Sequence, residues 1–289
     1  MRSLARQAAD CLAESRPSVQ LVFLLRFLAG SLLGVAAGPA QHGNVAVVGV
    51  GWMCCTMAIY LFNGVADREE DIANASTRPI ASGRLPVRSA VVVVGTLTTT
   101  GLLCAFSAGT GSGLLAVAYL LVGYAYSGPP FPLKRTYYTC TGAGLGLGLT
   151  TYAAGFLAGG RRPDVSLVIF AGAMTLWMAC VGGIAKEFSD VEGDRVAGRR
   201  TWPMVLGDTR ARWLLAVVAG GISAGLTVVA LLYSAQLIWC AVTVLLGAFG
   251  VTVAGLRATP GQDRSSRRTP YRAFMVTQLA AHLVLAVSL

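Results

Sequence analysis

Residues 51–71 read GWMCCTMAIYLFNGVADREED, an apolar run that passes directly into a cluster of acids. A second segment repeats this order, because the apolar run 167–184 is followed by KEFSDVEGD at residues 186–194. A helix places residues that are four apart on one face, so we expect two carboxylate pairs at the ends of two membrane-length helices. The aspartates at this spacing are Asp67 and Asp71 in the first stretch and Asp190 and Asp194 in the second.

The composition indicates a membrane protein. Of the 289 residues, 55% are hydrophobic and 12% are charged, and the mean hydropathy is +0.64. A soluble domain carries about 25% charged residues. Many apolar runs here approach the ~20 residues that are needed to cross a bilayer. We therefore expect an all-α polytopic membrane protein, in which 35 glycines let neighbouring helices approach closely.

The apolar runs predict about nine transmembrane helices in a single domain, residues 18–289, after a polar N-terminal segment, residues 1–17. The second and the sixth predicted spans both end in an acidic motif. This spacing suggests two four-helix halves plus a ninth helix around a central cavity. The predicted spans are 18–38, 44–66, 89–108, 112–127, 139–158, 165–187, 211–231, 233–255 and 271–289.

The charges support this topology. If the helices alternate across the membrane, the face that holds the N-terminus carries every one of the 23 Lys and Arg residues except Arg26, Arg161 and Arg162. Cytoplasmic loops are enriched in basic residues, so the N-terminus and both acidic motifs are predicted on the cytoplasmic side. Topology, anionic membrane lipids and a polyanionic substrate account for the net charge of +10 without a nucleic acid partner.

The aspartates are expected to bind metal. A carboxylate at a membrane helix centre costs roughly 2.5–3.5 kcal/mol, less toward the interface, and converging carboxylates also repel one another. Mg²⁺ prefers oxygen ligands and shares them between one or two carboxylates, water and phosphate. Two Mg²⁺ ions would neutralise the four aspartates, and Asn63, one helical turn before Asp67, can add a neutral oxygen. Zinc is disfavoured because neither Cys nor His accompanies the acids.

Basic residues beside the motifs are candidates to bind phosphate. Arg78 lies in NASTRPI (74–80), Lys134 closes YSGPPFPLKR (126–135), and Lys186 precedes Asp190 by four residues. Arginine forks and lysine ammonium groups both bind phosphate. The other loop arginines, Arg199 among them, are interpreted as topology charges. Four acids off the aspartate face are interpreted as surface charges: Glu69, Glu70, Glu187 and Glu192.

Together these motifs resemble those of the UbiA-type intramembrane prenyltransferases, over roughly residues 20–285. The resemblance implies nine transmembrane helices, a cavity on the cytoplasmic side, Mg²⁺ and an isoprenyl diphosphate donor. It also implies that the four aspartates and Asn63 hold the metal and diphosphate, that Arg78, Lys134 and Lys186 contact the diphosphate, and that Tyr126 lies near the reacting carbon. Residues 190–203 are most similar to members acting on homogentisate, chlorophyllide or geranylgeranylglyceryl phosphate. Gly64 departs from the polar residue that many relatives carry.

The implied reaction is ionisation of an allylic diphosphate followed by transfer of the isoprenyl group to an acceptor, expected to be an aromatic or quinone-precursor small molecule. Asp67, Asp71, Asp190, Asp194 and Tyr126 are then the candidate catalytic residues. A terpene cyclase of the same fold is the first alternative, because its carbocation would be attacked by its own double bond. A transporter or lipid-binding membrane protein is a more distant alternative, since intramembrane acids also occur in transporters.

Overall fold

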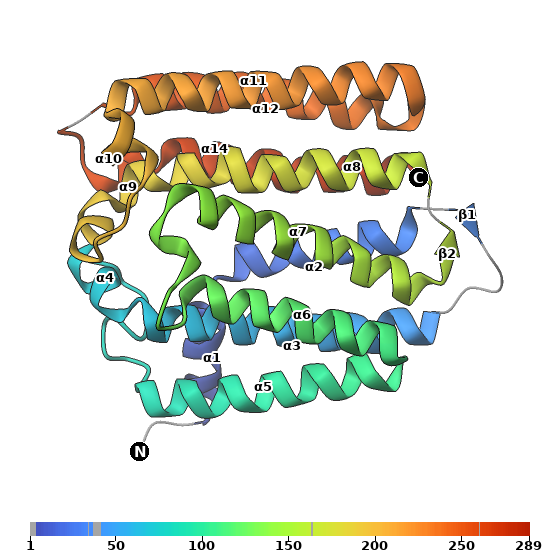
Figure 1. Ribbon diagram of the computed structural model, residues 1–289, viewed down its shortest axis with the longest axis horizontal. Helices are drawn as coiled ribbons and strands as arrows, with labels where there is room; N and C mark the ends of the chain where they lie inside the picture. The colour runs from blue at the N-terminus through green and yellow to red at the C-terminus, as the bar shows by residue number, and fades with distance from the viewer. Residues whose placement is uncertain (1–3, 34, 37–41, 163, 260) are drawn as a thin grey trace.

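The computed structural model describes residues 4–33, 35–36, 42–162, 164–259 and 261–289. Long, nearly parallel helices form a bundle (Figure 1), and the two further views show the same layering. In these described residues a long helix lies at each of the nine predicted spans. They are α2 (Pro17–Leu32), α3 (His42–Ala66), α5 (Val87–Ser107), α6 (Thr110–Ser127), α7 (Tyr137–Gly159), α8 (Val165–Leu176) continued by the π-helical turn η2 (Trp177–Gly182) and α9 (Gly183–Val196), α11 (Asp208–Tyr233), α12 (Ile238–Arg257) and α14 (Thr269–Ser288).

Short elements connect the long helices. At one end of the bundle, where α4 and α9 are labelled in Figure 1, lie the connections that carry the acidic motifs. The opposite end carries a two-stranded antiparallel pair, β1 with β2. The short elements are α1 (Leu4–Glu14), β1 (Val35–Ala36), α4 (Arg68–Ala73), η1 (Leu133–Arg135), β2 (Arg161–Arg162), α10 (Trp202–Leu206), η3 (Ala235–Leu237) and α13 (Arg264–Arg267).

The helices confirm the expectation of an all-α polytopic membrane protein. Among the described residues, seven helices are long and apolar enough to cross a membrane. The helices at the two other predicted spans are not among these seven. Helix α2 is apolar but has only 16 residues, and α7 is long enough but rich in glycine. Nine membrane crossings therefore remain a prediction.

Glycines let α2 and α7 pack backbone against backbone. A Cβ atom at Gly155 would lie 2.8 Å from the carbonyl carbon of Phe27, and one at Gly30 would lie 2.9 Å from the carbonyl carbon of Tyr152. Real Cβ atoms do not approach other atoms within 3.0 Å, so glycine is required at both positions. This matches the expectation that small residues allow close helix packing in a membrane.

The buried side chains form two main apolar clusters. One joins α2, α3, α5 and α6 to α7, and the other joins α7 through α12 to α14. Helix α14 contacts both α12 and α2, so it lies between the first and second sets of helices. This arrangement resembles the predicted two halves with a ninth helix, and it leaves a cavity between them.

Candidate functional site

The two acidic motifs meet where α4 crosses α9. Helix α3 ends at Ala66 and α4 begins at Arg68, yet the Asp71 N–H still donates to the Asp67 carbonyl at 2.8 Å, which keeps the two aspartates one helical turn apart. Across the crossing, the Gly193 N–H donates to Asn74 Oδ1 at 2.8 Å. A Cβ at Gly193 would lie 2.7 Å from the Glu70 carbonyl oxygen and closer still to Asn74 Nδ2. Glycine at 193 therefore lets the two motifs come together.

Arg199 lies at the centre of the joined motifs. Its guanidinium is 3.6 Å from Asp67 Oδ1 and 3.3 Å from Asp194 Oδ1, and it also pairs with Glu70. Lys134, which is buried, pairs with Asp67 and lies 3.7 Å from Glu70. One arginine thus links the first motif to the second, and the sequence interpretation of Arg199 as a topology charge was incomplete.

The other two aspartates face basic residues as well. Asp71 Oδ2 accepts from Arg78 Nη1 at 2.6 Å. Asp190 lies 3.5 Å from Lys186 Nζ, one turn earlier on the same helix, and 3.1 Å from Arg264 Nη2. Each predicted metal-binding carboxylate therefore has a cation beside it, and a bound metal ion would compete with these cations for the same oxygens.

Burial shifts the pKa of two groups between the motifs. Burial, followed by the charges of Arg199 and Lys186, lowers the pKa of Lys134 to about 6. Burial also raises the pKa of Glu70 above its ordinary value. An ammonium group so placed gains from an additional anion, because a nearby negative charge favours its charged form. The electrostatics at Lys134 are therefore suited to a polyanionic ligand.

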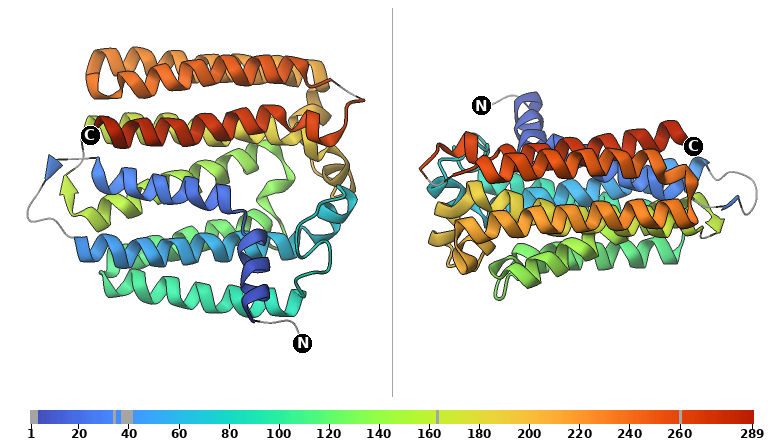
Figure 2. Two further views of the ribbon diagram at one scale, coloured as in Figure 1. Left: turned by 180° about the vertical axis from the view of Figure 1, so that it is seen from behind. Right: turned by 90° about the horizontal axis from the view of Figure 1, so that it is seen from above.

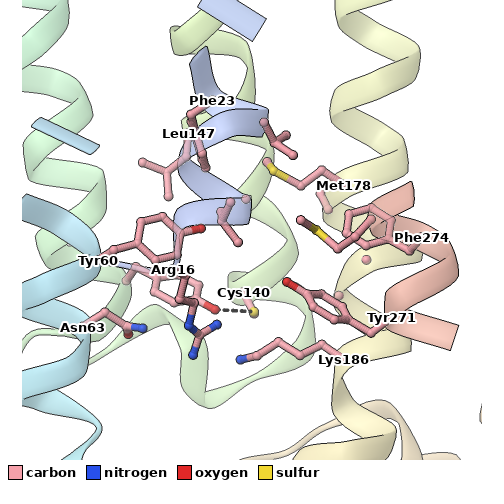
Figure 3. A pocket seen from close by; sticks show the side chains of 18 of the residues that line it. Arg16, Phe23, Tyr60, Asn63, Cys140, Leu147, Met178, Lys186, Tyr271 and Phe274 are labelled. Carbon is pink, nitrogen blue, oxygen red and sulfur yellow. Dashed lines mark hydrogen bonds between the residues drawn. The ribbon is translucent and has the colours of Figure 1, made fainter. Parts of the chain in front are cut away.

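A cavity of about 150 Å³ opens between the helices next to the motifs. It is lined by α2, α3, α6, α7, η2, α9 and α14, so it is central to the bundle as predicted. Figure 3 shows Arg16, Asn63 and Lys186 at one end, with Phe23, Leu147 and Met178 toward the other. The cavity is therefore polar and cationic at the end with the motifs and apolar deeper in the bundle.

The deep end of the cavity adjoins a buried cation, Arg26. Its guanidinium donates to the Sδ atom of Met178 at 2.6 Å and to the Met174 carbonyl at 3.3 Å. It also lies over the ring of Phe23, 5.5 Å from the centroid. These contacts compensate for placing a charge inside the membrane, and the intervening Met178 and Phe23 side chains give the cavity an apolar deep end.

Arg16 is a site residue that the sequence interpretation missed. Its guanidinium projects into the cavity between Asn63 and Lys186 (Figure 3). In the described part of the chain its side chain has no hydrogen bond or ion pair. The signal in the sequence was an arginine directly before Pro17, at the start of the first span and on the predicted side of the acidic motifs. It had been assigned to a polar segment outside the domain.

Of the predicted site residues, Asn63, Tyr126 and Lys186 line the central cavity. Asn63 Oδ1 accepts from the Ser127 hydroxyl, and the Tyr126 hydroxyl lies 3.5 Å from Cys140 Sγ. Lys134 instead lines a neighbouring hollow of about 210 Å³ together with Glu70 and Arg199. Arg78 lies on the far side of Asp71, against α1. The predicted phosphate-binding residues thus surround the motifs and do not share one wall.

The four glutamates that were interpreted as surface charges divide into two groups. Glu69 and Glu192 are exposed, and Glu192 pairs with Arg195 at 2.9 Å. Glu70 pairs with Arg199 and Lys134, as described above, and Glu187 Oε2 accepts the Trp202 N–H at 2.8 Å. For Glu70 and Glu187 the interpretation was wrong, because the loop after α9 folds back over them.

The donor atoms suit a hard divalent cation. They are the carboxylate oxygens of the two motifs at the α4–α9 crossing and the amide oxygen of Asn63, which lines the cavity beside them, and Mg²⁺ prefers ligands of this type. Within the residues that the structure describes, no three His, Cys, Asp or Glu side chains are close enough to hold a metal by themselves. Mg²⁺ commonly uses one or two carboxylates and takes its other ligands from water and substrate phosphates, so the residues present fit this ion.

Comparison with known proteins identifies relatives that match about two thirds of the chain. The chain is 29% identical over 204 residues to a chloroplastic chlorophyll synthase of Oryza sativa, matching 64% of this chain and 53% of the relative. It is 30% identical over 210 residues to a digeranylgeranylglyceryl phosphate synthase of Halobacterium salinarum, matching 71% and 70% of the two chains. The chain spans about half the length of the plant chlorophyll synthases that it matches.

Solved structures show the same fold. A UbiA homolog from Archaeoglobus fulgidus, bound to DMAPP and Mg²⁺, superposes with a TM-score of 0.70 at 20% identity, covering 96% of this chain and 99% of that one. The apo structure of a UbiA homolog from Aeropyrum pernix gives a TM-score of 0.66 at 17% identity, covering 92% and 95%. The model of the UbiA prenyltransferase family matches residues 23–277. The chain therefore belongs to the UbiA prenyltransferase family.

Proposed function

We propose that this protein is a Mg²⁺-dependent prenyltransferase, which moves an isoprenyl group from an isoprenyl diphosphate to a small acceptor. The observation that carries the proposal is the junction of paired aspartates and cations at the polar end of an apolar cavity. A diphosphate headgroup matches the charged end, and an isoprenoid chain matches the apolar lining. Membership in the family supports the same reaction class.

The residues divide into two roles in this proposal. Asn63 and the four aspartates would hold Mg²⁺, for which we expect two ions, and the metal would neutralise charge on the departing diphosphate. The binding of Mg²⁺ by a relative with DMAPP supports the choice of ion. The remaining diphosphate oxygens would be bound by cations around the motifs, namely Arg16, Arg78, Lys134, Lys186 and Arg199.

The cavity would protect the reacting carbon. When the carbon–oxygen bond to the diphosphate breaks, the bonding electrons leave with the diphosphate and the allylic carbon becomes electron-poor. Apolar walls at Phe23, Leu147 and Met178 would surround the isoprenoid chain deeper in the cavity and exclude bulk water there. Tyr126 lines the cavity, where the face of its ring can stabilise positive charge. A nucleophile of the acceptor then bonds to this carbon and loses a proton.

We propose an aromatic or quinone-precursor acceptor. The support is the aromatic lining of the cavity by Tyr60, Tyr126, Tyr271 and Phe274, since rings prefer offset-stacked or edge-to-face contacts with other rings. Relatives carry names that indicate different products, among them a prenylphloroglucinol prenyltransferase and a chlorophyll synthase. The acceptor must therefore be established by experiment on this chain.

We also propose that the site faces the cytoplasm. The acidic motifs lie at one end of the bundle, and the loops of that end carry most of the basic residues. Basic loops are retained on the cytoplasmic side during insertion. Labelling of single cysteines introduced at exposed Arg195 and exposed Arg162, in inverted and right-side-out vesicles, tests this orientation. Labelling of position 195 from the outer side would contradict it.

The function is tested with purified protein in detergent, Mg²⁺ and a panel of allylic diphosphates, with and without aromatic acceptors. We expect diphosphate release and a prenylated acceptor by mass spectrometry. Asp67→Asn and Asp190→Asn should abolish release. Asp164→Asn is the matched control, because Asp164 caps α8 at the opposite end of the bundle and asparagine also caps helices well. A cyclic hydrocarbon as sole product would instead indicate the cyclase.

A further inference from the structure

Glu14, the last residue of α1, is a buried carboxylate outside the predicted transmembrane domain. Its side chain is 0% exposed. Oε1 lies 2.5 Å from Arg78 Nη2, and Oε2 accepts the Ile80 N–H at 2.8 Å. Arg78 Nη2 also donates to the Glu14 carbonyl at 3.1 Å. The end of α1 therefore grips the loop that follows the first acidic motif through three polar contacts.

Gly64 provides the space for this carboxylate. Gly64 lies inside the first motif, directly after Asn63. A Cβ at residue 64 would lie 2.9 Å from Arg78 Nη2 and closer still to Glu14 Oε1. Any side chain at this position would push Glu14 away from the motif. Gly64 is thus coupled to Glu14 by direct contact.

Arg78 connects Glu14 to the site. Its Nη1 lies 2.6 Å from Asp71 Oδ2, while its Nη2 faces Glu14. The guanidinium therefore lies between two carboxylates, one expected to bind metal and one that does not line the cavity. A buried carboxylate is costly unless it is paired and hydrogen-bonded. The contacts with Arg78 and the Ile80 amide therefore fix the position of Glu14, and the same contacts fix the position of the Arg78 guanidinium.

We propose that Glu14 is a positioning residue, which keeps the Arg78 guanidinium beside the diphosphate site when Asp71 engages the metal and its ligand. When Asp71 binds a metal, its negative charge is shared between the metal and Arg78, so its hold on the guanidinium weakens and the contacts with Glu14 become the second anchor of Arg78. Helix α1 provides this anchor through Glu14 and so contributes to the diphosphate site. This inference rests on the proposed function, because it assigns a role in binding the same diphosphate.

The test measures diphosphate release by the full-length protein against geranyl diphosphate and geranylgeranyl diphosphate concentration. Glu14→Gln keeps the shape and removes the charge, and we expect KM for the donor to rise tenfold or more with a smaller change in kcat. Gly64→Ala approaches the same contact from α3 and should raise KM in the same way. Asp10→Asn, one turn earlier on α1 beside the exposed Arg84, is the matched control and should leave KM within twofold.

A double variant separates positioning from a general structural role. If Glu14 acts through Arg78, Glu14→Gln should change KM less than twofold in an Arg78→Lys background. A full additional effect there, or Glu14→Gln with the KM of the unchanged protein, would overturn the inference. If Glu14→Gln fails to fold, as judged by its melting in detergent, Gly64→Ala gives the same readout. Absence of release by the unchanged protein with every donor would instead contradict the proposed function.

Discussion

The substitution Gly193→Ala tests whether the close crossing of α4 and α9 assembles the site. The added Cβ would lie 2.7 Å from the Glu70 carbonyl oxygen, which has to retreat by about 0.3 Å to reach the 3.0 Å that real Cβ atoms respect. It would also displace the Asn74 side chain and remove its bond to the Gly193 N–H. Overpacking costs about 1–3 kcal/mol, and the lost hydrogen bond adds about 0.5–1.5 kcal/mol.

The displacement should fall on α4, because it has six residues and its neighbour belongs to a long continuous helix. Glu70 and Asp71 would move relative to Asp190 and Asp194, and misplacement by 1 Å can cost about hundredfold in rate. For a movement of a fraction of this size, we expect kcat/KM for diphosphate release to fall about tenfold, equivalent to about 1.4 kcal/mol. The cost of overpacking and of the lost hydrogen bond should also lower the melting temperature in detergent by several degrees.

Gly172→Ala is the matched control for this experiment. Gly172 lies on the same continuous helix, and a Cβ there meets no described atom within 4 Å. Its alanine variant should keep full activity. Full activity of both the Gly193→Ala and the Gly172→Ala protein would refute the idea that the crossing sets the geometry of the site. An equal loss of activity in both would show that any added side chain on this helix impairs the enzyme, which would also contradict a specific role of the crossing.

Three further outcomes are expected. Arg16→Gln should raise KM for the allylic diphosphate about tenfold, because its guanidinium faces the cavity without a partner among the described residues. Hydrogen bonds to charged groups contribute about 1.5–3 kcal/mol. An unchanged KM would show that Arg16 does not bind the diphosphate. Gly155→Ala should destabilise the protein by about 1–3 kcal/mol, unlike Gly142→Ala, whose Cβ meets no described atom within 4 Å; thermal melting in detergent compares them. Chelation of divalent ions should stop diphosphate release, and added Mg²⁺ should restore it; persistent release would contradict metal dependence.

Much of the fold could be predicted because long apolar runs in the sequence indicate membrane-spanning helices. The predicted spans 44–66 and 139–158 correspond to α3 (His42–Ala66) and α7 (Tyr137–Gly159) within a few residues. The sixth prediction, 165–187, was too short at its C-terminus, since the helix continues to Val196 and carries the second motif with it. Hydropathy shows where an apolar run ends. It does not show how far a helix continues once its residues become polar outside the membrane.

The parts of the site that were missed depend on how loops fold back. Arg199 reaches Asp67 and Asp194 because the turn after α9 brings it over the crossing, and nothing in its local sequence differs from that of Arg200. Glu70 was set aside because it lies off the face of Asp67 and Asp71 on an ideal helix. In the structure it is the partner of Arg199. Spacing predicts which residues share a helix face, but not which residue of a distant loop will meet them.

The predicted metal-binding carboxylates of the site are paired with basic side chains. Asp71 and Asp190 each face a cation that is held from outside the crossing, Arg78 by α1 and Arg264 by the start of α13. A metal ion that takes these carboxylates would displace the cations from them without removing them from the site. The freed cations would then face the phosphate oxygens that the metal brings. Metal and diphosphate are therefore expected to bind together more strongly than either does alone, because each neutralises the charge that the other uncovers.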